Sequence, residues 1–165
     1  MKIETARFGE LEVDAAQIFT FSMGILGFAA LKSFVIVERD RQHFKWLQSV
    51  DDPSVAFVLG DPLSFYPSYL AVIKRTELQA IAPLEERDLV LSVIMTVASA
   101  PEDISANLCA PLIFNLANRR AMQYVLNDQR YPVKYFVFKE SAAGAQAPSP
   151  SNSGERQDPR SLSLR

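Results

Sequence analysis

The chain has 165 residues, of which 48% are hydrophobic and 22% charged, with a formal net charge of -2 at pH 7. This length and composition are those of one globular domain that can bury its own core. The nearly balanced charge argues against the basic surface on which binding to RNA or DNA depends. The single cysteine, Cys109, excludes an intramolecular disulfide and indicates a reducing compartment.

The amino-terminal segment does not resemble a targeting or membrane segment. Residues 1–5 alternate polar and apolar side chains, and the long apolar region of a signal peptide does not follow them. No run approaches the roughly 18 to 20 apolar residues that cross a bilayer. We therefore expect a soluble, cytoplasmic protein that does not associate with membranes.

The first third of the chain predicts short strands joined by tight turns. Residues 3–8 alternate as a strand does, and Asp14 is placed to cap one helical turn over residues 15–18. Gly24 and Gly27 lie among bulky apolar residues and predict a bent loop with positive φ or close backbone packing. A phosphate-binding loop is disfavoured, because the third glycine and the lysine of such motifs are missing.

The rest of the chain is organised around residues 44–53, whose pattern predicts a strand that ends in an acidic turn. The only tryptophan, Trp46, shares one side of this strand with Gln48. Asp51 and Asp52 then form a turn with Pro53, because aspartates bond to their own backbone and proline restricts the residue before it. Residues 33–38 form the first arm of the same hairpin.

The remaining patterns predict an all-β, single-domain, antiparallel barrel-like fold with few short helices. Barrel closure would also remove exposed, aggregation-prone strand edges. The expected strands span residues 55–59, 70–73, 89–98, 106–116, 123–126 and 131–138, and residues 78–82 fit a strand or a short helix.

The last part of the chain differs in composition from the rest. Residues 141–165 contain no aromatic or β-branched side chain and cannot bury enough apolar area to offset their ordering entropy. We therefore expect a folded domain over residues 1–140 and a disordered tail over residues 141–165.

The sequence offers no catalytic constellation. The only histidine, His43, lies in a polar turn, and Cys109 lies in an apolar strand, where cysteine usually serves packing. Asp51 and Asp52 are adjacent, so their side chains point apart and make a poor acid–base pair. One histidine, one cysteine and scattered carboxylates do not supply a metal site. We expect no enzymatic activity, no metal and no cofactor.

Binding to single-stranded RNA remains an alternative. Five tyrosines could stack on bases, as in other barrel proteins that bind single strands. Such sites also need a basic groove, and the two basic pairs, 74–75 and 119–120, are isolated from each other. Residues alone therefore support a binding module, and the slightly acidic charge balance mildly favours protein partners over nucleic acid.

Several blocks in the right order together resemble the family of flagellar assembly factor FliW. The most specific block is Trp-Leu-Gln-Ser-Val-Asp-Asp-Pro at residues 46–53, followed by Ala-Phe at residues 56–57. The other matching positions are residues 5–9, Phe21, Gly24, Gly27, Phe28, Asp61, Pro62, Phe65, Tyr69, residues 106–108, Ala110, Pro111, residues 123–126 and residues 131–133. The resemblance covers residues 1–139 and leaves the tail outside.

The resemblance implies a barrel-like binding protein without catalytic activity. Members of this family bind flagellin in the cytoplasm and also bind the RNA-binding translational regulator CsrA. When flagellin is exported, the freed factor binds CsrA and relieves its repression of flagellin translation. For this chain the resemblance implies the same two protein partners, no direct contact with nucleic acid and a monomer when free.

The residues expected to contact partners are Trp46, Gln48, Asp51, Asp52, Asn107 and Pro111. Each has a structural alternative. Trp46 and Gln48 can belong to the core, the two aspartates can stabilise only their turn, and a buried Asn107 can hold barrel geometry. If exposed, the aspartates suit a basic patch on an RNA-binding partner.

Overall fold

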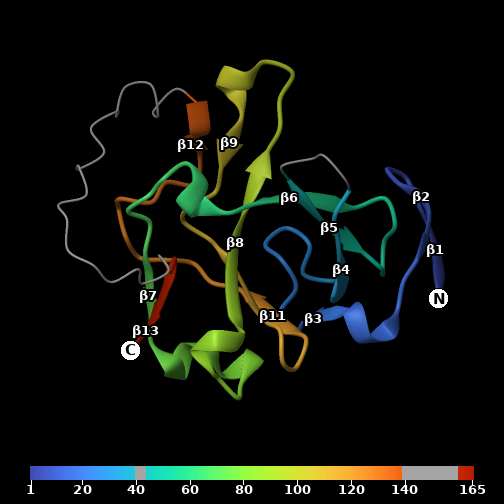
Figure 1. Ribbon diagram of the computed structural model, residues 1–165, viewed down its shortest axis with the longest axis horizontal. Coiled ribbons are helices and arrows are strands. Elements are labelled where there is room, and N and C mark those ends of the chain that lie inside the picture. Colours follow the sequence, from blue (N-terminus) through green and yellow to red (C-terminus); the bar gives the residue numbers. More distant parts are fainter. Residues whose placement is uncertain (40–43, 139–159) are drawn as a thin grey trace, which may run out of the picture.

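The computed structural model describes residues 1–39, 44–138 and 160–165, and most of its regular structure is β (Figure 1). Five short 3₁₀ helices connect the strands. The strands are β1 (Lys2–Thr5), β2 (Gly9–Glu12), β3 (Phe19–Phe21), β4 (Ser33–Val37), β5 (Lys45–Ser49), β6 (Ala56–Gly60), β7 (Ala71–Ile73), β8 (Leu89–Thr96), β9 (Ser105–Ala106), β10 (Leu112–Asn115), β11 (Arg120–Gln123), β12 (Tyr135–Phe136) and β13 (Leu162–Leu164). The helices are η1 (Ala15–Gln17), η2 (Pro62–Ser64), η3 (Arg75–Ile81), η4 (Glu86–Asp88) and η5 (Pro101–Asp103).

Seven strands close into a barrel in the order β10-β11-β3-β4-β5-β6-β8, and pairing of β8 with β10 completes the ring. Every pair in the ring is antiparallel except β11 with β3, which is parallel. The expected all-β, barrel-like class is confirmed. Closure leaves no free edge in the ring itself, which is how barrels avoid edge-to-edge association.

Alternating residues of the barrel wall supply two separate hydrophobic clusters. In β6, Val58 belongs to one cluster and the next residue, Leu59, to the other. In β10, Leu112 and Phe114 belong to the second cluster and Ile113 to the first. The two-residue period of a strand therefore builds a core on each side of the wall.

One cluster, which we call the inner cluster, draws nearly all its members from barrel strands: Phe19, Phe21, Ile25, Phe34, Leu47, Leu59, Leu112, Phe114 and Ala121. The other packs the wall formed by β6, β8 and β10 against η3, β7 and the segment near β12. Tyr69 is buried in this outer cluster, and its hydroxyl donates a hydrogen bond to the carbonyl oxygen of Leu108 at 2.9 Å. A covering layer thus lies on one side of the barrel.

The structure corrects several expected boundaries. The single strand expected over 106–116 is two strands, β9 and β10, separated by a loop. Of the strand expected over 123–126, only Gln123 lies in a strand, as the last residue of β11, and residues 124–126 do not. The ambiguous residues 78–82 lie mostly within η3. The hairpin of β4 and β5, the capping of η1 by Asp14 and the positive φ of Gly24 and Gly27 are as expected.

The end of the chain also differs from the expected disordered tail. Residues 162–164 form strand β13, which pairs in parallel with β7. Residues 141–159 lie outside the described residues, as does His43. Among the described residues, no helix has the length and apolar character that a bilayer-crossing helix needs.

Candidate functional site

Trp46 lies on the side of β5 that faces away from the inner cluster, and the turn between β1 and β2 partly covers it. Its neighbour Leu47 is fully buried in that inner cluster. The guanidinium carbon of Arg7 lies 4.3 Å from the centroid of the Trp46 ring, and the ring of Phe8 meets it edge-on at 5.7 Å. Trp46 is therefore a half-buried platform that holds the amino-terminal hairpin against the barrel.

Gln48 serves the turn between β5 and β6. Its side chain is fully buried, and its Nε2 donates to the carbonyl oxygens of Ser49, Pro53 and Val55 at 2.9, 3.1 and 3.1 Å. Its Oε1 has no hydrogen-bond partner among the described residues. Gln48 therefore stabilises the acidic turn through hydrogen bonds to its backbone and does not itself reach the surface.

Asp51 ties this turn to the start of β4. Its Oδ2 accepts hydrogen bonds from the backbone N–H groups of Lys32 at 2.6 Å and Ser33 at 2.8 Å. Partial burial acts to raise the pKa of Asp51, but the bonds from Lys32 and Ser33 outweigh it, so that the pKa is lowered. The carboxylate is exposed and stays charged at neutral pH.

Asp52 has a more local role. Its Oδ1 accepts hydrogen bonds from the hydroxyl of Ser54 at 2.6 Å and from the backbone N–H of Ser54 at 3.0 Å. These two bonds lower the pKa of Asp52. The turn after β5 therefore presents two adjacent negative charges, both held in place by hydrogen bonds.

The loop from Asn107 to Pro111 connects β9 to β10. The half-buried Asn107 accepts a hydrogen bond at Oδ1 from the N–H of Ala110 at 3.1 Å, and its own N–H donates to the carbonyl oxygen of Ile94 in β8 at 2.9 Å. Pro111 is buried, and its carbonyl oxygen accepts from the N–H of Tyr124 at 3.0 Å. Asn107 thus fixes the loop, while part of its surface stays accessible.

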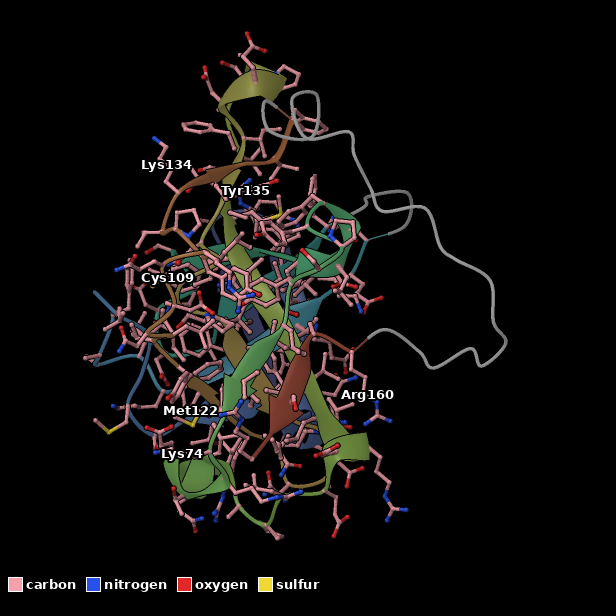
Figure 2. All side chains as sticks on the ribbon, turned by 90° about the vertical axis from the view of Figure 1, so that its left-hand side faces the viewer. Lys74, Cys109, Met122, Lys134, Tyr135 and Arg160 are labelled. Carbon is pink, nitrogen blue, oxygen red and sulfur yellow. The ribbon has the colours of Figure 1, made fainter. Side chains whose placement is uncertain are left out.

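Cys109 lies at the middle of this loop, on the side of the molecule that faces the viewer in Figure 2. It is half-buried, and its Sγ is 3.6 Å from the carbonyl oxygen of Leu126. That contact is a weak hydrogen bond from a small thiol. Cys109 is therefore partly accessible, and it lies in a loop and not in the strand expected from the sequence.

An exposed apolar loop that the sequence analysis did not select adjoins the 107–111 loop. Met23, Leu26 and Phe28 follow β3, and their exposed fractions are 75%, 67% and 39%. We call these three residues the apolar loop. Clustered exposed apolar side chains mark interaction sites more often than scattered ones do.

Glycine and Gln123 hold the apolar loop in shape. Gly24 has φ +67°, and a Cβ there would lie 2.7 Å from the Cα of Ala29. Gln123 accepts a hydrogen bond at Oε1 from the N–H of Leu26 at 2.9 Å and donates from Nε2 to the carbonyl oxygen of Ala110 at 3.2 Å. One amide therefore bridges the apolar loop and the 107–111 loop.

The expected site residues thus fall into two groups. Trp46, Gln48, Asp51 and Asp52 belong to β5 and its turn, and Asn107 and Pro111 belong to the loop beside the apolar loop. Among the described residues, no hydrogen bond joins Asp51 or Asp52 to Asn107. The available signal for the apolar loop was its pair of glycines beside bulky apolar residues, which predicted the bend but not the exposure.

The described residues contain no group of three or more histidine, cysteine, aspartate or glutamate side chains that could hold a metal ion. The candidate site combines exposed apolar side chains on a fixed loop with a pair of ordered carboxylates. Such features suit contact with another macromolecule.

Comparison with known proteins identifies the domain. A family model described as FliW protein matches residues 2–137. The flagellar assembly factor FliW of Syntrophus aciditrophicus (strain SB) is 37% identical over 140 residues, which make up 84% of this chain and 89% of that protein. The factor of Geobacillus sp. (strain WCH70) is 36% identical over 143 residues, 87% of this chain and 99% of that protein.

A solved structure agrees with these relatives. The crystal structure of the flagellar assembly factor FliW aligns with a TM-score of 0.78 at 36% sequence identity, covering 85% of this chain and 99% of that chain. Family model, relatives and structure all span the barrel and its covering layer. This chain belongs to the FliW family of flagellar assembly factors.

Proposed function

We propose that this chain is a non-enzymatic, cytoplasmic binding protein that couples flagellin export to flagellin translation. It binds flagellin while flagellin is held in the cytoplasm, and it binds the regulator CsrA when flagellin has been exported. Such a switch needs no chemistry, because the concentrations and affinities of the competing partners set which complex forms. Membership of the FliW family is the observation that carries the proposal.

The apolar loop supports a protein partner. Met23 and Leu26 expose most of their side chains, yet the loop is fixed by Gly24 and by the bonds of Gln123. A preorganised apolar surface loses little conformational entropy on binding. We assign this loop, with the adjoining Asn107, to the contact with flagellin.

The acidic turn supports a basic partner. Asp51 and Asp52 carry charge at neutral pH and are held in one geometry by backbone N–H groups and by Ser54. Exposed charges of this kind steer association and set specificity more than they add affinity. We assign this turn to the contact with CsrA, whose RNA-binding surface is expected to be basic.

Titration calorimetry with the flagellin of the same organism tests the apolar loop. Leu26→Asp places a charge in the proposed contact, and we expect it to weaken flagellin binding at least tenfold, since buried unpaired charges are costly. Leu116→Asp is the matched control. Leu116 is also exposed, at 42%, but it lies beyond the opposite end of β11 from Gln123.

Equal affinity of the Leu26→Asp and Leu116→Asp variants for flagellin would show that the apolar loop does not contact flagellin. A wild-type protein that is folded but binds neither flagellin nor CsrA would contradict the proposed function itself. In that case single-stranded RNA at low salt is the ligand to try, because RNA binding by a barrel would weaken steeply as salt rises.

A further inference from the structure

Strand β7 is paired, within the described residues, only with the last strand of the chain. β7 and β13 form a parallel two-stranded sheet with Leu162 beside Ala71, Ser163 beside Val72 and Leu164 beside Ile73. Figure 1 shows β13 lying along β7 at one side of the molecule, and Figure 2 shows the same pair from the front. The polypeptide between residues 138 and 160 links β13 to the domain.

The backbone of residues 161–165 supplies the partners that the edge of β7 needs. The N–H of Ala71 donates to the carbonyl oxygen of Ser161 at 2.8 Å, and the N–H of Arg165 donates to the carbonyl oxygen of Ile73 at 2.9 Å. The N–H of Arg75 donates to the carbonyl oxygen of Arg165, also at 2.9 Å. Residues 161–165 therefore bind the edge of β7 through main-chain hydrogen bonds, as a peptide does when it adds a strand to a sheet.

The two strands differ in how firmly the domain holds them. Ala71 and Ile73 are fully buried in the outer cluster, whereas Leu162 and Leu164 are half-buried at its margin. Arg160 forms an ion pair with Glu86 at 3.9 Å, and both side chains are about half exposed. Exposed pairs of this kind contribute little. β7 is thus a fixed acceptor, and β13 is a lightly anchored strand.

β13 also lies outside the part of the chain that the family shares. The family match ends at residue 137, and 85% of this chain already covers 99% of the solved relative. The edge of β7 belongs to the shared domain, but the strand that covers it does not. An uncovered edge with buried apolar neighbours is a template for another strand.

We propose that the edge of β7 is a docking site for an extended polypeptide segment of another protein with two apolar residues at alternate positions. Residues 160–165 of this chain occupy that site and act as a tethered competitor. A partner segment adds in parallel to β7 only when residues 160–165 leave. This site is distinct from the apolar loop and the acidic turn, so its test does not depend on them.

A labelled peptide with the sequence of residues 158–165 tests the site in trans. The acceptor is the full-length variant Leu162→Asp/Leu164→Asp, in which charges at the two half-buried positions release the strand. A tethered segment acts at an effective concentration on the order of 1 mM. A peptide with a Kd of about 0.1 mM should therefore bind the variant about tenfold more tightly than the wild type.

Two controls make the comparison specific. Ser163→Asp adds a charge beside the exposed Val72 and should leave peptide binding as weak as in the wild type. Peptide N-methylated at Arg165 loses the donor to Ile73 and should bind at least tenfold more weakly than peptide N-methylated at Leu164. The N–H of Leu164 points away from β7, because successive residues of a strand alternate their backbone directions.

Equal peptide binding to the wild type and to the folded double variant would overturn the proposal, as would no binding to that variant. Hydrogen exchange in the wild type covers the case in which the variant does not fold. The amide of Ala71 should exchange by a local opening that is insensitive to low denaturant, while that of Val93 in β8 requires global unfolding. Exchange of Ala71 only by global unfolding would show that β13 does not leave its site.

Discussion

At the scale of single residues, the conspicuous polar groups of residues 46–53 serve the turn first. Gln48 donates hydrogen bonds to three backbone carbonyl oxygens. Asp51 accepts hydrogen bonds from the N–H groups of Lys32 and Ser33 at the start of β4. The sequence could predict that a buried Gln48 needs polar partners, but not that all of them belong to its own turn. The partner contacts proposed for this turn therefore depend on a geometry that Gln48 and Asp51 set.

Replacing Gln48 by alanine should destabilise the fold. The change leaves three buried or half-buried carbonyls without their shared donor and opens a space beside them, at a cost of about 1 to 3 kcal/mol in the free energy of unfolding. Urea denaturation measures this loss, and Gln129→Ala at an exposed position is the control. A loss no larger than that of the control would mean that the carbonyls find other donors.

Asp51 makes stability depend on pH in a defined direction. Its folded pKa is below the ordinary value of 3.8, so its stabilising effect is complete above that value and is lost as pH falls through the folded pKa. The difference in unfolding free energy between the wild type and Asp51→Asn should therefore be constant from pH 7 to about pH 5 and shrink below pH 4. Thermal melts across this range test it, and a difference independent of pH would contradict the role of the charge.

At the scale of elements, most strands could be predicted and their ends could not. β8 was predicted because its sequence is rich in β-branched residues and is bounded by charged and proline turns, and in the structure Leu91, Val93 and Met95 are buried. All four residues of β10 are buried, so no alternation marks where that strand begins. The strand expected over 106–116 breaks where Asn107 bonds to the N–H of Ala110 and where Pro111 has no N–H for a ladder.

The bend after β3 was predictable from the sequence, but the packing around its two glycines was not. Two glycines predicted the loop, and both have positive φ, at +67° for Gly24 and +85° for Gly27. Their surroundings differ in a way that the sequence does not reveal. A Cβ at Gly24 would meet the backbone of Ala29 at 2.7 Å, whereas a Cβ at Gly27 would meet nothing within 4 Å.

This difference predicts unequal effects of the same substitution. Gly27→Ala should cost about 1 kcal/mol in the free energy of unfolding, because an L-residue is strained at positive φ. Gly24→Ala adds a backbone clash to that strain and should cost about 2 to 4 kcal/mol. Chemical denaturation of both variants measures the two losses. Equal losses would show that the chain near Ala29 moves aside without penalty.

At the scale of the whole molecule, the barrel class followed from many short strands with few helices, but the covering layer did not. The order of strands around the ring, including the parallel pair of β11 and β3, depends on contacts between residues far apart in the chain. The disordered tail was inferred from an average composition over residues 141–165. Averaging hid the alternation of Leu162 and Leu164, which is enough to form a strand on an edge that the domain already presents.

The proposed exchange of two protein partners is also a property of the whole domain. Our proposal assigns flagellin and CsrA to different surfaces, the apolar loop and the acidic turn. Two surfaces on one domain can still exclude each other, through overlap of the bound partners or through a coupling free energy between the sites. In either case each partner must weaken the binding of the other by the same factor.

The most direct measurement is a calorimetric titration of the purified protein with CsrA, first alone and then with saturating flagellin present. We predict a stoichiometric complex with CsrA alone and an affinity for CsrA at least tenfold lower when flagellin is bound. Asp51→Asn/Asp52→Asn should weaken the first titration and leave flagellin binding unchanged, with Asp14→Asn, another exposed turn aspartate, as the control. Equal affinity for CsrA with and without flagellin would contradict the partner switch.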